Sequence, residues 1–264
     1  MLSVLMATYS GEAASALDAC LNSLAQQTRT ADQIVLVRDG LLTSELEKTI
    51  QKYQATLPLE CHDYEGNDRL AGALNFGLKF CSGEFIARMD SDDIAVATRF
   101  EKQLIDIQTL GADVLGAAIC EFGCDVDDVR SIRRCPEIVC EGDIVARNPF
   151  NHMTVLFRKS SVIDVGGYMP LEGFEDWYLW LRLFHNGANL RNSEEQLVFA
   201  RVGNEFLSRR KGLKYAIREY SALRRFYSEG LINFTQMAKG IILRIPVRLA
   251  PAKVVETFYS RLLR

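Results

Sequence analysis

Three carboxylates crowd the end of a hydrophobic run: Asp90, Asp92 and Asp93 follow Phe85–Met89. Like charges this close repel and raise one another's pKa, so the arrangement is costly unless a cation is bound nearby. Carboxylate oxygens suit Mg²⁺ and Mn²⁺, and a metal that keeps open coordination positions also accepts diphosphate oxygens. The cluster therefore predicts a divalent-metal site. The alternative is a solvated turn, or acids that cap a helix beginning near Thr98.

A second acidic pair, Glu175 and Asp176, opens a strongly amphipathic helical pattern. Large apolar residues recur at helical spacing behind it, namely Trp177, Trp180, Leu181 and Phe184. The pattern places both carboxylates at the positive end of the helix and buries its aromatic face. Such anchors would fix Asp176 at the wall of a pocket. Simple compensation of the helix dipole is the alternative.

Elements that could position these acids alternate along the first half of the chain. Apolar runs predict strands at Leu2–Ala7, Ile34–Val37, Leu57–Tyr64 and Phe85–Met89. Helical patterns lie between them, two of them with the capping boxes Ser44-x-x-Glu47 and Thr98-x-x-Glu101. This βαβα order predicts an α/β fold with a Rossmann-like, mostly parallel twisted sheet flanked by helices on both faces. Ligands of such sheets bind beyond the carboxyl ends of the strands.

The second half is less regular. Apolar runs predict strands at Val114–Ile119, Thr154–Arg158 and Val198–Val202, and Gly166-Gly167 indicates a turn. From Gly212 onward the pattern is helical, and we expect breaks at Gly230, Pro246 and Pro251.

Charge is unevenly distributed over the 264 residues. From Arg209 onward there are 13 Lys/Arg against 3 Asp/Glu, or +10, whereas the first 208 residues carry 18 against 31, or −13. We therefore expect two parts: a domain at 1–208 and a basic helical tail at 209–264. Anionic surfaces attract such a tail.

A membrane surface suits the tail better than nucleic acid does. Around Met237–Leu249 apolar residues alternate with Arg244 and Arg248, and Lys253 follows, which is typical of a helix lying at an anionic lipid interface. The basic residues form no groove-reading motif, so we expect no nucleic-acid partner. The alternative is that these helices pack on the domain or form a dimer contact.

Localisation and cysteine usage both point to a cytoplasmic protein. No segment offers about 18 uninterrupted apolar residues, and Leu2–Ala7 is too short, without a preceding positive charge, for a signal peptide. Seven cysteines are then expected to be free thiols. A zinc site at Cys120, Cys124, Cys135 and Cys140 is the alternative, although their pairwise spacings exceed the usual two residues.

Several motifs in a fixed order carry a family resemblance. They are Ala7-Thr8-Tyr9-Ser10, Val37-Arg38-Asp39-Gly40, the run from Asn67 to Gly77, the Asp90 cluster, and Gly173-Phe174-Glu175-Asp176-Trp177. From residue 1 to about 205 the chain resembles the family 2 inverting glycosyltransferases. These have the type A glycosyltransferase fold, and the resemblance is greatest to those that build bacterial capsules, exopolysaccharide and lipopolysaccharide, such as amylovoran-type enzymes.

The resemblance implies Mn²⁺- or Mg²⁺-dependent transfer of a sugar from a nucleotide diphosphate, by analogy UDP, to a glycan or lipid-linked acceptor. It implies a peripheral location on the inner face of the cytoplasmic membrane. By matching motif positions, it assigns the catalytic base to Asp176, the metal to Asp92 and Asp93, and donor binding to Thr8, Tyr9, Asp39, Arg69, Asn75 and Asp90.

Three further positions are less defined. Arg38 stands where the family has an acid, which leaves the pairing at that turn open. His152 falls in a segment that the family places beside the acceptor, although a structural histidine is an equal alternative. Arg201, after the last strand, is a candidate contact for the diphosphate.

Two other functions fit parts of the sequence. Sugar-phosphate nucleotidyltransferases also combine a doubly wound sheet with metal-binding acids, but Ala7–Glu12 lacks their glycine-rich phosphate loop with its basic residue. A module that binds nucleotide sugars at the membrane without turnover is favoured only by Arg38.

Overall fold

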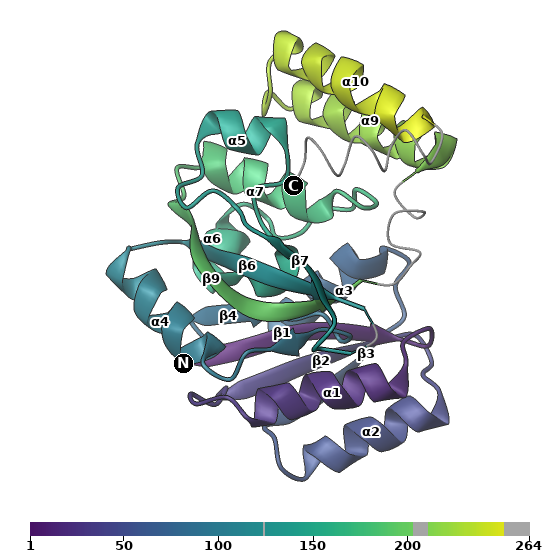
Figure 1. Cartoon of the computed structure of the whole chain (residues 1–264), viewed down its shortest axis with the longest axis vertical. Helices are drawn as coiled ribbons and strands as arrows, with labels where there is room; N and C mark the ends of the chain where they lie inside the picture. The colour runs from purple at the N-terminus through teal and green to yellow at the C-terminus, as the bar shows by residue number, and fades with distance from the viewer. Residues whose placement is uncertain (124, 203–210, 251–264) are drawn as a thin grey trace.

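The N-terminal half of the chain repeats strand and helix, as its sequence predicts. The computed structural model describes residues 1–123, 125–202 and 211–250 (Figure 1). In chain order the first elements are β1 (Leu2–Tyr9), α1 (Ala14–Ala25), β2 (Gln33–Asp39), α2 (Ser44–Gln54), β3 (Leu59–Tyr64), α3 (Arg69–Phe80), β4 (Phe85–Arg88), β5 (Ile94–Ala95) and α4 (Arg99–Thr109).

The second half adds strands and shorter helices, and ends in a helical hairpin. Its elements are β6 (Val114–Phe122), β7 (Val129–Arg133), α5 (Glu141–Ala146), a 3₁₀ turn (His152–Thr154), β8 (Leu156–Arg158), α6 (Lys159–Asp164), α7 (Glu175–His185), β9 (Leu190–Arg201), α9 (Gly212–Ser228) and α10 (Phe234–Leu249).

All described strands join one sheet, in the order β3-β2-β1-β4-β8-β6-β9-β5, with β7 paired to β6. The four strands β3, β2, β1 and β4 are parallel, as expected for a βαβ unit. Beyond them the sheet is mixed. Strand β8 runs antiparallel to its neighbours β4 and β6, whereas β6 and β9 run parallel to each other. The carboxyl ends of β1, β2 and β4 therefore lie along one edge.

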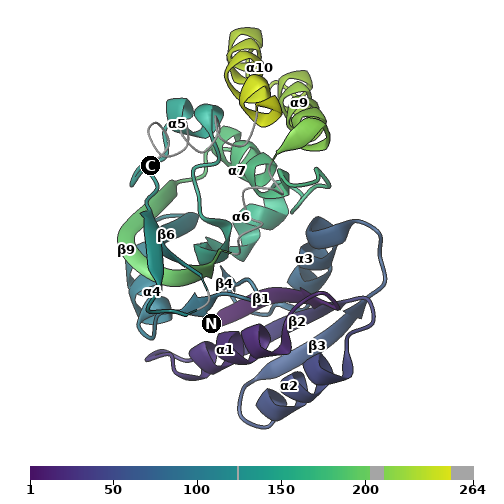
Figure 2. The same ribbon diagram turned by 45° about the vertical axis from the view of Figure 1, so that its right-hand side comes forward.

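The two faces of the sheet bury two separate cores. Leu2, Val4 and Met6 of β1 pack with residues of α1, α2 and α4, whereas Leu5 packs with α3 and α7 on the opposite face. Figure 2 shows α1 and α2 on one side of the sheet and α3 on the other. This alternation is the period-2 pattern of a strand covered on both faces.

Three local predictions need correction. The N-cap of α2 is Thr43 rather than Ser44, and its hydroxyl accepts a hydrogen bond from the Leu46 amide at 3.3 Å. Thr98 makes no side-chain cap, and Glu101 instead accepts a hydrogen bond from Thr28 Oγ1 at 2.7 Å. Pro246 lies inside α10 instead of ending it. The proline is exposed, so the carbonyl that it leaves without an internal donor can face water.

Other predictions about the tail have mixed outcomes. Gly230, at φ +73°, follows the end of α9, as predicted. Pro251, Lys253 and the boundary between residues 208 and 209 lie outside the described residues.

The hairpin of α9 and α10 packs beside α5 and α7 at one end of the molecule (Figure 1). Its centre is Glu219, which is 0% exposed and accepts hydrogen bonds from Arg244 Nη1 at 2.8 Å and Arg248 Nε at 2.7 Å. Arg244 also stacks on the ring of Trp177 and Arg248 on that of Tyr215. The expectation that these two arginines face lipid is therefore wrong. They are needed inside, where a buried carboxylate requires paired cations.

Replacing Glu219 with Gln should destabilise the protein by about 3 kcal/mol, because two largely buried arginines then lose their counter-ion. Burial opposes ionisation of Glu219, but the hydrogen bonds and charges of Arg248 and Arg244 hold its pKa below the ordinary value. A depressed carboxyl pKa stabilises the fold at neutral pH and loses that effect as the pH falls. Denaturant unfolding should therefore show a difference between wild type and variant that shrinks in acid. The exposed Glu194→Gln is the matched control, and equal effects of the two variants would contradict the prediction.

Candidate functional site

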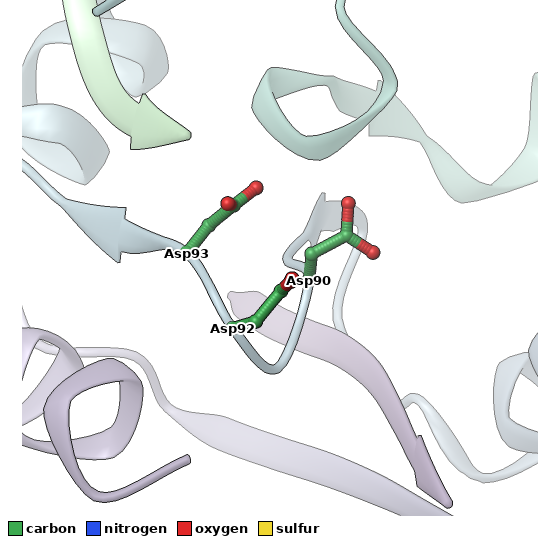
Figure 3. Close-up of side chains that lie close together, drawn as sticks. All are labelled: Asp90, Asp92 and Asp93. Carbon is green, nitrogen blue, oxygen red and sulfur yellow. The ribbon is translucent and has the colours of Figure 1, made fainter. Parts of the chain in front are cut away.

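The three predicted metal ligands lie on one short loop between β4 and β5 (Figure 3). One carboxylate oxygen from each of Asp90, Asp92 and Asp93 lies within 4.8 Å of those of the other two. Asp93 is 2% exposed, and its Oδ1 accepts a hydrogen bond from the Arg201 amide at 2.8 Å. Its Oδ2 is buried and has no hydrogen-bond partner. A buried, unpaired carboxylate oxygen is what a missing cation would satisfy.

Burial and mutual repulsion make this loop electrostatically unfavourable without such a cation. Burial, followed by the charges of Asp90 and Glu12, raises the pKa of Asp92 to about 6. Burial, Asp90 and Asp92 likewise raise the pKa of Asp93. The buried Arg88 pairs with Asp90, but its charge does not offset the burial and repulsion that raise these two pKa values. An oxygen-ligating divalent cation therefore fits the residues present.

Two neighbours of this loop were not identified from the sequence. Glu12, in the turn after β1, accepts a hydrogen bond from Ser91 Oγ at 3.2 Å and adds a fourth acid. Arg88 is buried, and its Nε and Nη1 have no hydrogen-bond partner. Arg88 lies in the apolar run Phe85–Met89 before Asp90. Its burial depends on tertiary packing, which no local pattern shows.

The predicted nucleotide loop lies at the same edge of the sheet. In the parallel register Thr8 is opposite Arg38 and Tyr9 is opposite Asp39, so Thr8, Tyr9 and Asp39 lie together. Thr8 is buried with its hydroxyl unpaired, whereas Tyr9 is 52% exposed. Burial raises the pKa of Asp39. These groups are placed to contact a ligand beyond the strand ends.

The unusual Arg38 is accounted for by its neighbours. Its guanidinium pairs with Asp63 at 2.7 Å and Glu47 at 3.2 Å. These acids neutralise the arginine locally, so its presence does not remove Asp39 from the edge.

Arg69 lines a pocket between α3 and the loop before α7. The cavity has a volume of about 250 Å³. It is lined by residues 67–71 and by residues 170–173 and 175 of the segment that leads into α7. Arg69 has a left-handed backbone, φ +52°, and pairs with Glu172, which also contacts Arg218 at 2.6 Å. A left-handed conformation in a residue other than glycine is strained and is frequent at functional sites.

The side chain of Asn75, predicted to bind the donor, contacts the backbone of Tyr168. Its Nδ2 donates to the carbonyl of Tyr168 and its Oδ1 accepts from the Tyr168 amide at 2.8 Å. Gly167 passes so close that a Cβ there would meet Asn75 Oδ1 at 2.5 Å. Asn75 thus joins α3 to the turn at 166–168, and its donor-binding role stays a prediction.

Asp176 opens α7, as predicted, with Trp177 and Trp180 buried behind it. Its Oδ1 accepts a hydrogen bond from the Trp177 amide at 2.7 Å, and its Oδ2 accepts one from Asn148 Nδ2 at 2.6 Å. Burial, together with the charge of Asp176, raises the pKa of Glu175. The carboxylate of Asp176 is therefore held in one orientation.

Tyr168 links the two acidic groups. Burial raises the pKa of its hydroxyl, Arg88 opposes the shift, and the charges of Asp176, Glu175 and Asp90 add to it. The acids at the start of α7 and the acidic loop after β4 thus both act electrostatically on the Tyr168 hydroxyl.

Of the other two less defined residues, Arg201 lies at the acidic loop and His152 contacts Tyr168. Arg201 Nε donates to the Asp92 carbonyl at 3.3 Å, so its guanidinium lies at the acidic loop. His152 is held by Tyr168, with Nε2 2.9 Å from its hydroxyl. Burial lowers the pKa of His152 well below its usual value, which favours the structural alternative.

The zinc alternative finds no support in the described residues. Among the described residues, the potential metal ligands that cluster are Asp90, Asp92 and Asp93, and no cysteine joins them. Cys124 lies outside the described residues. Cys120 instead donates to Gln196 Oε1 at 3.0 Å, and Cys140 is exposed.

In the same described ranges, the helices are too short or too polar to cross a bilayer.

The chain thus combines a parallel βαβ unit with an acidic loop beyond its strand ends and a second, anchored carboxylate. This arrangement fits a nucleotide-dependent transferase. The family model for glycosyl transferase family 2 matches residues 3–169. The chain belongs to this family. The membership confirms the predicted family and favours it over the nucleotidyltransferase alternative.

Similar proteins extend over nearly the whole chain. It is 36% identical to the amylovoran biosynthesis glycosyltransferase AmsE of Erwinia amylovora, over 99% of this chain and 98% of the relative. It is also 36% identical to the UDP-Gal:α-D-GlcNAc-diphosphoundecaprenol β-1,3-galactosyltransferase of Escherichia coli, over 99% and 96%.

Solved structures confirm the fold. S. aureus TarS (1–349) in complex with UDP-GlcNAc superposes with a TM-score of 0.70 at 18% identity, over 98% of this chain and 73% of that one. The mannosyltransferase PcManGT from Pyrobaculum calidifontis, in complex with GDP-Man and Mn²⁺, gives 0.69 at 15%, over 99% and 75%.

Mn²⁺ should stabilise the protein more at pH 7.5 than at pH 5. In the folded protein without metal, the pKa of Asp92 is raised to about 6. Protonated Asp92 therefore stabilises the fold at low pH, and this stabilisation is lost as the pH rises through about 6. Protons also compete with the metal below it. Thermal unfolding with Mn²⁺ near 100 times its Kd should report about 2.7 kcal/mol at pH 7.5. Asp92→Asn should abolish the effect, and an equal shift at both pH values would contradict the prediction.

Proposed function

We propose that the protein is a metal-dependent inverting glycosyltransferase. Its donor is a UDP-sugar and its acceptor is a sugar on a lipid diphosphate, in the synthesis of a bacterial surface polysaccharide. The observation that carries this proposal is the under-neutralised cluster of Asp90, Asp92 and Asp93 at the same sheet edge as Thr8 and Asp39. The Escherichia coli relative, which uses UDP-Gal and a GlcNAc-diphosphoundecaprenol acceptor, supports the donor and acceptor classes, and AmsE supports the polysaccharide product.

The residues divide between binding the donor and activating the acceptor. Thr8, Tyr9, Asp39 and Arg69 hold the nucleotide, and Asp92 and Asp93 hold the metal with Asp90 beside them. A divalent cation there neutralises the negative charge that develops on the departing diphosphate. PcManGT, which has the same fold, was crystallised with Mn²⁺, which supports this choice of ion.

Asp176 is the general base. Its carboxylate takes the proton of an acceptor hydroxyl, whose oxygen forms the new bond to the anomeric carbon as the bond to the diphosphate breaks. Attack from the face opposite the leaving group inverts the anomeric centre, so an α-linked donor gives a β-linked product. The pocket of about 250 Å³, lined by Arg69 and by Glu175, the residue before Asp176, is a place for a ring of the substrate.

A lipid-linked acceptor also explains the surface of the helical hairpin. On α9 the residues Leu213, Ile217, Tyr220 and Tyr227 recur at helical spacing and are 43% to 66% exposed. On α10, Phe234, Ile242, Leu243 and Leu249 are 53% to 69% exposed. The exposed cations Lys214, Arg224 and Lys239 accompany them. We propose that this hairpin lies on an anionic membrane surface, with those residues rather than Arg244 and Arg248 in contact with lipid.

Asp176→Asn should lower sugar transfer by about 10²–10⁴-fold while leaving UDP-sugar binding unchanged, because the amide keeps the shape of the side chain but is no base. Asp92→Ala should instead weaken the Mn²⁺-dependent part of donor binding. Radiolabel transfer to a synthetic diphosphate-linked acceptor and calorimetric titration of donor separate the two effects. If Asp176→Asn lost binding and transfer equally, Asp176 would be structural.

Leu213→Ser combined with Ile217→Ser should reduce binding to vesicles that contain anionic lipid by on the order of 10-fold or more, since two apolar side chains no longer insert. Ile105→Ser with Ile163→Ser, at comparably exposed positions on α4 and α6, is the matched control. Flotation of the full chain measures the bound fraction. Unchanged flotation of the α9 variant, or equal loss in the control, would overturn membrane docking by this face.

A further inference from the structure

The amide of Asn148 has a defined orientation at the base. Its Oδ1 accepts a hydrogen bond from the Phe150 amide at 3.1 Å, and its Nδ2 donates to Asp176 Oδ2 at 2.6 Å. A flipped amide would set Nδ2 against the Phe150 N–H and Oδ1 against the carboxylate, so both contacts would be repulsive. The backbone of the segment thus aims one donor at Asp176.

The segment that carries Asn148 is itself held from two sides. Trp177, next to Asp176, donates its indole Nε1–H to the Ile144 carbonyl at 2.6 Å. From the hairpin, Arg244 donates to the Ala146 carbonyl and stacks on the Trp177 ring at 4.7 Å. Arg244 is in turn fixed by the fully buried Glu219. Asn148 and Asp176 therefore share one set of supports.

We propose that Asn148 is a positioning residue for Asp176, and that Arg244 extends this support to the C-terminal hairpin. The side chain of Asn148 restricts the rotation of the Asp176 carboxylate through the hydrogen bond to Oδ2. The hairpin is then both the membrane-facing part of the protein and one wall of the support for the base. The inference rests on the proposed role of Asp176.

The expected effect follows from geometry. A base contributes fully only when it lies within hydrogen-bond reach of the proton in the reactive arrangement, and a displacement of about 1 Å can cost on the order of 100-fold in rate. The Trp177 amide contacts Oδ1 of Asp176, and Asn148 adds a side-chain hydrogen bond to the other oxygen, Oδ2. Loss of the Asn148 amide therefore loosens the carboxylate at the oxygen that the backbone amide does not contact.

The primary test is Asn148→Ala in the full chain. We expect kcat for transfer to fall by about 10- to 100-fold, with the KM for UDP-sugar and the melting temperature close to wild type. Asn148→Asp has the same shape but sets an acceptor against Asp176, so its kcat should fall at least as far. Asn186→Ala, an exposed asparagine at the other end of α7, should leave kcat unchanged.

A structural role for Asn148 gives a different result. In that case Asn148→Ala would lower the melting temperature and raise the KM, and Asn148→Asp would resemble it in both measurements. Wild-type kcat in Asn148→Ala would also overturn the proposal. If Asp176→Asn were fully active, the proposed function itself would fail, and this outcome is distinguishable because it does not involve Asn148.

The link to the hairpin is tested by Arg244→Lys, which keeps a cation beside Glu219 but loses the flat guanidinium that reaches both Ala146 and Trp177. We expect kcat to fall several-fold while vesicle binding stays at the wild-type level. Combined with Asn148→Ala, the second substitution should add little, since both act through Asp176. Fully multiplicative losses in the double variant would show that Arg244 does not act through Asn148.

Discussion

The repulsion among Asp90, Asp92 and Asp93 is the constraint that organises the site. Three buried or half-buried acids on one loop would separate if the backbone allowed it. It does not: β4 is paired on both sides, the Asp90 carbonyl accepts from Cys20 Sγ, and Asp93 is bonded to the Arg201 amide. The fold thus holds a strong negative potential in place, which is the preorganisation that a cation site requires.

Two buried arginines support this loop from the protein side. Arg88 pairs with Asp90, and Arg99 donates to the Arg88 carbonyl at 2.8 Å and to Gln103 Oε1 at 3.0 Å. Burial and the charge of Arg88 lower the pKa of Arg99 to about 9. The cationic charge beneath the loop reduces the repulsion without cancelling it. The hairpin repeats this arrangement with the opposite sign, since two arginines surround the single acid Glu219.

Much of the fold could be predicted because its signals are local. The strands β1, β2 and β4 are buried on both faces and read as continuous apolar runs, and Asp90, Asp92 and Asp93 are adjacent in sequence. The missed features depend on partners far along the chain. Asn75 bonds Tyr168, 93 residues away, and Asn148 bonds Asp176, 28 residues away. The sequence shows that Arg244 and Arg248 are basic, but only tertiary packing shows that Glu219 draws them inward.

The most direct measurement is a crystal structure with Mn²⁺ and UDP, with data collected at a wavelength where manganese scatters anomalously. We predict an anomalous peak at about 2.1–2.2 Å from carboxylate oxygens of Asp92 or Asp93, with the diphosphate completing its coordination. A structure in which UDP is bound at Thr8 and Asp39, while the acidic loop faces solvent without a peak, would contradict the metal-dependent site.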